Sequence, residues 1–109
     1  MKIKDLQDPT KELNIDLKII WDKSSIENKW GHKIKTVIVV DADSEQSSES
    51  ALLDLFDGDI DKYSFKDKIR VVNGYAKLSK NKRNQFRIGY GFIKGKLVGH
   101  YEKIEDEHT

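Results

Sequence analysis

Only one stretch of this chain, between its third and fourth strand-like segments, can form a helix, and that stretch is short. Apolar and polar side chains alternate over Leu13–Trp21, apart from Ile20, which is the period of a strand with one buried face. β-Branched residues dominate His32–Asp41, and Ala51–Phe56 is a short apolar run. Ile60–Phe65 then provides one helical turn or a short helix.

The second half of the chain contains the remaining strands. Lys68–Leu78 is rich in β-branched residues, and Gly74 within it predicts a bulge or bend. Gln85–Phe92 alternates again, and His100–Ile104 predicts a short closing strand. Three strands, a short helix and two strands are the layout of the five-stranded Greek-key OB-fold barrel. We therefore predict an all-β fold, because doubly wound α/β folds need a helix after most strands.

Stretches with polar residues, Gly or Ser are expected to connect these strands. Lys23–Gly31, Ala42–Ser50 and Ile93–Gly99 are predicted loops or turns, and Ser79–Asn84 is a predicted basic hairpin turn. The alternation also predicts that four residues belong to the core: Trp21, Phe86, Ile88 and Tyr90.

The length of 109 residues suits a single domain. We expect residues 1–104 to form this domain and the acidic residues 105–109 to form a tail. No apolar run approaches the length of a membrane-spanning helix, and Met1–Leu13 lacks the apolar core of a signal peptide. The sequence therefore predicts a cytoplasmic protein with no membrane partner.

Residue patterns of enzymes and metal sites are absent from the sequence. It has no cysteine, which excludes disulfides and thiolate metal sites. The histidines at 32, 100 and 108 are scattered, and no glycine cluster forms a Walker-type loop. Asp57–Asp61 resembles part of a calcium loop but lacks the full ligand pattern, and its carboxylates fit a turn and a helix N-terminus better. We predict no catalytic residues, no metal and no cofactor.

Charge is distributed unevenly along a chain whose net charge is only +1. Residues 1–60 contain 8 Lys or Arg and 13 Asp or Glu, whereas residues 61–109 contain 12 and 6. Lys77–Lys96 holds seven basic residues and no acidic one. Such a segment can present a cationic face to phosphates even on a nearly neutral protein, although a solvated hairpin would have the same composition.

Aromatic residues are predicted to lie close to these cations. Bases of a single strand stack on aromatic rings, which stabilises binding by about 1–3 kcal/mol per base. In an OB fold the middle strands and the loops between strands 1–2 and 4–5 line the ligand groove. Trp30 falls in the first of these loops, Phe56 at the end of the third strand and Tyr75 on the fourth, so we predict that these three stack on bases. Seven cations are predicted to contact phosphates: Lys33, Lys35, Lys77, Lys80, Lys82, Arg83 and Arg87.

Each predicted stacking residue also has a structural alternative. Tyr75 could lie in the core with its hydroxyl hydrogen-bonded, and Phe56 could cover one end of the barrel. An exposed tryptophan is uncommon, so Trp30 is either a contact residue or a lid on the barrel.

Several segments follow one another in an order that is typical of a known family. Trp30–Thr36 lies where the family has a Gly-containing turn into the second strand. Asp54–Asp57 lies at the end of the third strand, where the family usually has a tryptophan followed by a small or acidic residue. Lys66–Tyr75 is similar to a Gly-Asp, apolar strand and Asn-Gly-Tyr stretch. From about Ile3 to Ile104, the chain resembles the small archaeal single-stranded DNA-binding proteins and the single-OB subunit of the human sensor of single-stranded DNA complex.

This resemblance implies sequence-tolerant binding of single-stranded DNA, for protection in replication, recombination or repair, and association with the nucleoid. It assigns base stacking to Phe56 and Tyr75. Two further stacking positions of the family fall on Ser79 and near Gly89, and the polar loop before the third strand is longer here. These departures bear on the expected affinity and site size.

Two other functions are compatible with the sequence. The acidic first half and the Asp-, Ser- and Glu-rich loop would suit an OB subunit that docks a protein, as in replication protein A-like complexes of replication and repair. Stacking does not distinguish the 2′-hydroxyl, so RNA is an alternative ligand.

Overall fold

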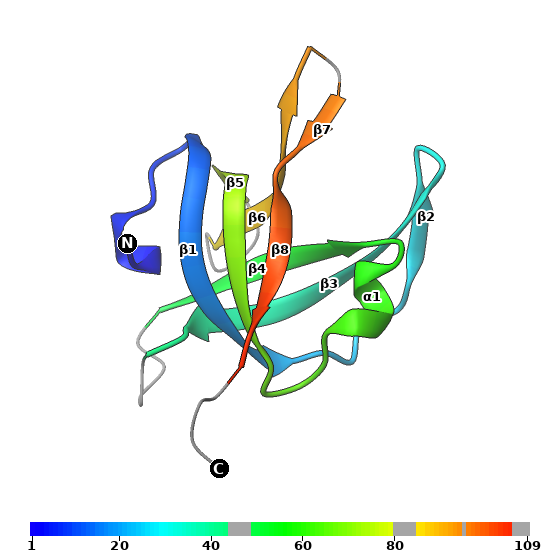
Figure 1. The fold of residues 1–109 in the computed structure, drawn as a ribbon, viewed down its shortest axis with the longest axis horizontal. Coiled ribbons are helices and arrows are strands. Elements are labelled where there is room, and N and C mark those ends of the chain that lie inside the picture. The colour runs from blue at the N-terminus through cyan, green and yellow to red at the C-terminus, as the bar shows by residue number, and fades with distance from the viewer. Residues whose placement is uncertain (44–48, 80–84, 95, 106–109) are drawn as a thin grey trace.

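Five of the eight described strands close into a barrel, and the other three extend the sheet (Figure 1). The structure is a computed structural model that describes residues 1–43, 49–79, 85–94 and 96–105, without the side chains of residues 92, 93 and 97. The strands are β1 (Thr10–Trp21), β2 (Glu27–Lys29), β3 (His32–Asp41), β4 (Ser50–Phe56), β5 (Lys68–Leu78), β6 (Phe86–Ile93), β7 (Lys96–Val98) and β8 (His100–Ile104). The helical elements are the 3-10 turn η1 (Ile3–Asp5) and the helix α1 (Asp59–Lys62).

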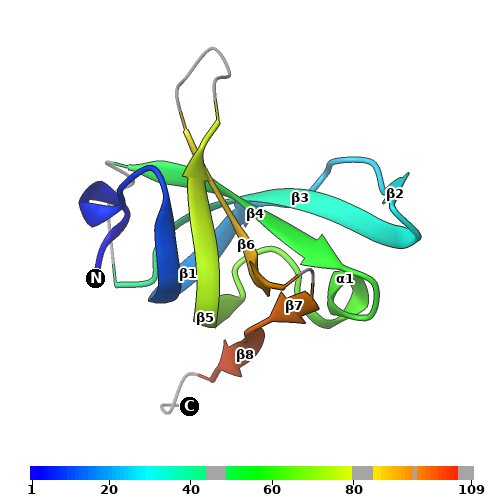
Figure 2. The same cartoon turned by 90° about the horizontal axis from the view of Figure 1, so that it is seen from above.

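The strand pairing confirms the predicted OB-type barrel. β1 is antiparallel to both β3 and β5, β3 is antiparallel to β4, and β4 runs parallel to β6. β6 also pairs with β5 and so closes the barrel, which Figure 2 shows from above. α1 lies in the connection from β4 to β5, as predicted. A closed five-stranded barrel with a short helix between its third and fourth strands is the OB arrangement.

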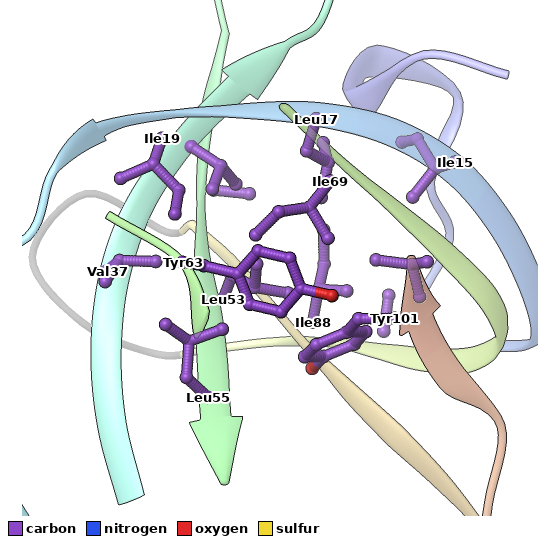
Figure 3. Packing of buried hydrophobic residues seen from close by; sticks show 14 of the residues in the cluster. Ile15, Leu17, Ile19, Val37, Leu53, Leu55, Tyr63, Ile69, Ile88 and Tyr101 are labelled. Atoms are coloured by element: carbon purple, nitrogen blue, oxygen red, sulfur yellow. The ribbon is translucent and has the colours of Figure 1, made fainter. Parts of the chain in front are cut away.

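The core forms because alternate residues of the barrel strands point inward. On β4, Leu53 is fully buried, whereas Asp54 beside it faces outward and is partly exposed. Tyr63 and Tyr101 complete the core, the first from the segment after α1 and the second from β8 (Figure 3). β8 pairs with the first half of β5, so the predicted closing strand is confirmed.

Two strands form in stretches that were predicted to be loops or turns. Within the described residues, β2 lies in Lys23–Gly31 and pairs only with β3, and β7 lies in Ile93–Gly99 and pairs only with β6. All three residues of β2 are exposed, so no apolar alternation marks it in the sequence. β7 is three residues long, which is too short for a period to be recognised. Of the other predicted connections, residues 44–48 and 80–84 lie outside the described residues.

The prediction that Trp21 belongs to the core is wrong. Ile19 is fully buried, but the pairing of β1 with β3 then shifts by one residue, and Trp21 pairs with Ile38. The extra residue, Ile20, inverts the alternation and turns Trp21 outward, where 42% of it is exposed. The other three predicted core residues lie in the core or pack against it: Ile88, Phe86 and Tyr90.

Gly74 lies at the bulge that the sequence predicts. Leu13 and Ile15 of β1 pair with Gly74 and Val71, so β5 contains one extra residue over this interval. A Cβ atom on Gly74 would lie 2.5 Å from Cγ1 of Val71 and 2.9 Å from the carbonyl oxygen of Gly89. The two strands therefore approach so closely here that no larger residue fits without displacement of the backbone.

Gly74→Ala is expected to lower the free energy of unfolding by about 1–3 kcal/mol, because the added methyl group overpacks the bulge. Urea unfolding followed by circular dichroism measures the loss. Gly89→Ala is the matched control, since its Cβ would meet Phe56 at an ordinary 3.9 Å. Equal losses in the two variants would contradict close packing at Gly74 as the cause.

Candidate functional site

A groove of about 850 Å³ runs across the outer face of the barrel. Its floor consists of residues that alternate with the core residues of β3, β4, β5 and β6, and the hairpin of β2 and β3 forms one rim. Figure 1 shows this hairpin projecting beyond the barrel strands. We call this feature the outer groove. The aromatic residues that line it are Trp30, Phe56, Tyr75 and Tyr90, and the cationic ones are Lys29, Lys77 and Arg87.

The three predicted stacking residues come together in the outer groove. Phe56 ends β4, Tyr75 lies on β5, and Trp30 lies in the turn between β2 and β3. Phe56 and Tyr75 are both partly buried, so each ring keeps a face or edge open to a ligand. Neither belongs to the buried core cluster, which removes the alternative of a purely structural role for Tyr75 within the core.

Tyr90 also lines the outer groove, although the alternation of β6 predicts that it belongs to the core. Its ring stacks on Phe56, with 5.1 Å between centroids and 22° between planes. It also contacts the ring of the buried Tyr101, 4.7 Å away, and its hydroxyl donates a hydrogen bond to Asp59. Tyr90 thus connects the core to the groove. Burial raises the pKa of the Asp59 carboxyl that accepts this hydrogen bond.

Trp30 is 85% exposed although it lines the outer groove. Lys29 pairs with His32, so the hairpin turn consists of Trp30 and Gly31 alone. Both have positive φ, 52° and 79°, which is the pattern of a type I′ turn. Glycine adopts this backbone freely, whereas tryptophan does so at a cost in conformational energy. A strained, solvent-exposed aromatic residue is typical of a binding contact rather than of packing.

The side chains of His32, which lines the groove, and Asp57 are in close contact. Nδ1 of His32 lies 2.7 Å from Oδ2 of Asp57, and the backbone N–H of Lys33 donates to Oδ1 of Asp57 at 3.0 Å. The Lys33 N–H, followed by the His32 ring, lowers the pKa of Asp57. The His32 ring also meets the Phe56 ring edge-on, with 6.4 Å between centroids.

Arg87 is held on the groove floor by Asp54 and Thr36. Its Nε donates to Oδ2 of Asp54 at 2.8 Å, and its Nη2 donates to Oδ1 of Asp54 and to Oγ1 of Thr36, each at 3.0 Å. The hydrogen bonds to Asp54 raise the pKa of the Arg87 guanidinium. These three residues come from β6, β4 and β3, which lie side by side in the sheet.

The predicted phosphate-binding residues divide into three groups. Lys77 and Arg87 line the outer groove. Lys33 and Lys35 alternate with the groove residues of β3 and point to the opposite face of that strand. Lys29 lines the groove as well, although no sequence pattern singled it out, and its ammonium lies 3.4 Å from Glu27. The remaining predicted cations lie outside the described residues: Lys80, Lys82 and Arg83.

No group of His, Asp and Glu side chains among the described residues is arranged to hold a metal ion. Within the same residues, no helix has the length and apolar character needed to cross a membrane. A scan against protein-family models finds no match to this chain, and a search of curated proteins finds none either.

Proposed function

We propose that this chain binds single-stranded nucleic acid, with DNA as the expected ligand, by stacking bases in the outer groove. The observation that carries the proposal is the convergence of Trp30, Phe56 and Tyr75 from three separate elements onto one open surface. Stacking on such rings tolerates any base. In line with the resemblance to archaeal single-stranded DNA-binding proteins, we also propose that the chain protects single strands at the nucleoid during replication, recombination or repair.

The position of the groove supports the proposal. In OB folds, oligonucleotides bind across the face of strands 2 and 3 and against the loops between strands 1–2 and 4–5. Here those barrel strands are β3 and β4, and the first loop contains the β2 strand and its turn. Lys77 is placed near the second loop, at the end of β5. A single strand that stacks along the floor would therefore have a cation close to its phosphates.

The test is a titration with oligo(dT) at low salt, followed by tryptophan fluorescence, since Trp21 and Trp30 are the two tryptophans of the chain. Binding of oligo(dT) is the expected result, with affinity that falls as salt rises by a slope of about −0.7 per phosphate contact. No binding at low salt would contradict the proposal. Competition with an RNA of the same sequence distinguishes the two nucleic acids.

Tyr75→Ala is expected to weaken oligo(dT) binding by about 5- to 150-fold, because one stacked base contributes about 1–3 kcal/mol. Circular dichroism should show that the barrel still forms, since the side chain is partly exposed. Phe65→Ala is the matched control: Phe65 is 52% exposed and does not line the outer groove. Unchanged affinity of Tyr75→Ala, or an equal loss in Phe65→Ala, would show that Tyr75 does not stack.

A further inference from the structure

The centre of the outer groove presents hydrogen-bond donors that are held in one orientation. Asp54 accepts from Nε and Nη2 of Arg87, and Thr36 accepts from Nη2 and donates to Oδ1 of Asp54 at 2.8 Å. The remaining guanidinium nitrogen, Nη1, has no partner among the described residues. The group therefore offers N–H donors, while both carboxylate oxygens of Asp54 are already occupied.

The exposure of the pair favours contact with a base over contact with a phosphate. The side chain of Arg87 is 43% exposed but that of Asp54 only 14%, so a ligand meets the guanidinium and not the carboxylate. The carboxylate neutralises most of the attraction that Arg87 would exert on a phosphate. Lys77, which also lines the groove, has no such acidic partner among the described residues. Phosphates should accordingly lie near Lys77, and a base edge near Arg87.

Gly89 leaves room for a base beside the pair. A Cβ atom on Gly89 would lie 3.9 Å from the Phe56 ring and 4.0 Å from the Asp54 carboxylate, with nothing closer. Gly89 is also the partner of Tyr75 across β5 and β6. The absent side chain thus opens the space between Phe56, Tyr75 and the Arg87–Asp54 pair, and a base that stacks on either ring can turn its edge toward Arg87.

We propose, on the basis of the proposed function, that Arg87, oriented by Asp54 and Thr36, makes the outer groove prefer keto bases over amino bases. Thymine and uracil carry a keto oxygen at position 4, and guanine carries one at position 6. Each of these oxygens can accept a hydrogen bond from the guanidinium. Cytosine and adenine carry an NH₂ group at the same positions. With these bases, an N–H donor of Arg87 would face an NH₂ donor of the base. The two groups cannot form a hydrogen bond with each other, which makes binding of cytosine and adenine weaker.

The experiment compares the affinities of the full chain for oligo(dT), oligo(dU) and oligo(dC) of equal length. Oligo(dU) is the control for the thymine methyl group. We expect oligo(dT) and oligo(dU) to bind about tenfold more tightly than oligo(dC), which is within the range of discrimination for an arginine–base contact. Absence of binding to all three would overturn the proposed function together with this inference. Equal binding to all three would overturn the inference alone.

Variants of Arg87 show whether the preference arises from this residue or from differences in flexibility between the oligonucleotides. Arg87→Gln offers both a donor and an acceptor, so its oligo(dT) to oligo(dC) affinity ratio should fall toward one. Arg87→Lys keeps the charge and is still a donor only, but it lacks the fixed planar donors, so its ratio should fall by less than that of Arg87→Gln. Lys77→Gln is the matched control, which should weaken binding to all three equally and leave the ratio unchanged. An unchanged ratio in Arg87→Gln would overturn the inference.

Discussion

Replacing Trp30 with asparagine is expected to stabilise the fold and to weaken nucleic-acid binding at the same time. Trp30 and Gly31 both have positive φ in their two-residue turn, and Asn-Gly is the sequence that such a turn favours most. A left-handed backbone costs an ordinary L-residue about 1–2 kcal/mol, much of which asparagine avoids. We therefore expect Trp30→Asn to raise the free energy of unfolding by about 1 kcal/mol.

The loss of binding in Trp30→Asn should be about 5- to 150-fold, the effect of removing one stacking residue. Urea unfolding measures the first effect, and titration with oligo(dT) measures the second. Trp21→Thr is the matched control, because Trp21 is exposed on β1 but does not line the outer groove. That variant should bind normally. If Trp30→Asn lost both stability and affinity, Trp30 would be a packing residue. If the variant kept its affinity, Trp30 would not contact the ligand.

The largest expected loss of stability follows from Tyr101→Ala. Tyr101 is 6% exposed, its hydroxyl donates to the backbone carbonyl of Asp54 at 2.7 Å, and its ring contacts those of Tyr63 and Tyr90. Removing a buried aromatic side chain leaves a cavity and typically costs about 3–5 kcal/mol. This is a large fraction of the about 5–15 kcal/mol that stabilises a domain. Urea or thermal unfolding would show it directly.

Tyr101→Phe is the control for the cavity, because it keeps the ring and loses only the hydroxyl. It should cost about 1–3 kcal/mol, since the Asp54 carbonyl loses its partner. Burial also raises the pKa of Tyr101 well above its usual value. The wild-type protein should therefore lose stability as the pH rises above about 10, where the unfolded tyrosine ionises and the folded one does not. If Tyr101→Ala and Tyr101→Phe were equally stable, β8 would not complete the core.

The barrel could be predicted from the sequence because its strands alternate or are rich in β-branched residues. β3 and β5 occupy the residues that these patterns indicate, His32–Asp41 and Lys68–Leu78. The pattern fails for β2, which pairs with β3 but has no buried residue. It also fails at Trp21, because the extra residue Ile20 reverses which side chains face the core. The exposed residues of β2 show no apolar pattern, and the break in alternation at Ile20 does not by itself reveal that the strand pairing shifts there.

The candidate site could be predicted in part. Trp30, Phe56 and Tyr75, which all line the outer groove, were identifiable as candidates by their aromatic type and by their place relative to the strands. Tyr90 was not, since its alternation with Ile88 indicates the core, and its contact with the Phe56 ring joins two residues that are far apart in the sequence. The Arg87–Asp54 pair joins residues 33 positions apart on parallel strands, and no local spacing predicts such a contact.

The outer groove combines a floor and a rim of very different local stability. β5 is paired along its length, with β1 on one side and with β8 and then β6 on the other. Among the strands that the structure describes, β2 pairs only with β3, and all three of its residues are exposed. Local opening therefore requires little free energy at β2 and close to the global unfolding free energy at β5. A bound strand would meet a rigid surface on one side and an adjustable one on the other, so bases of different size can be accommodated by the movement of a single hairpin.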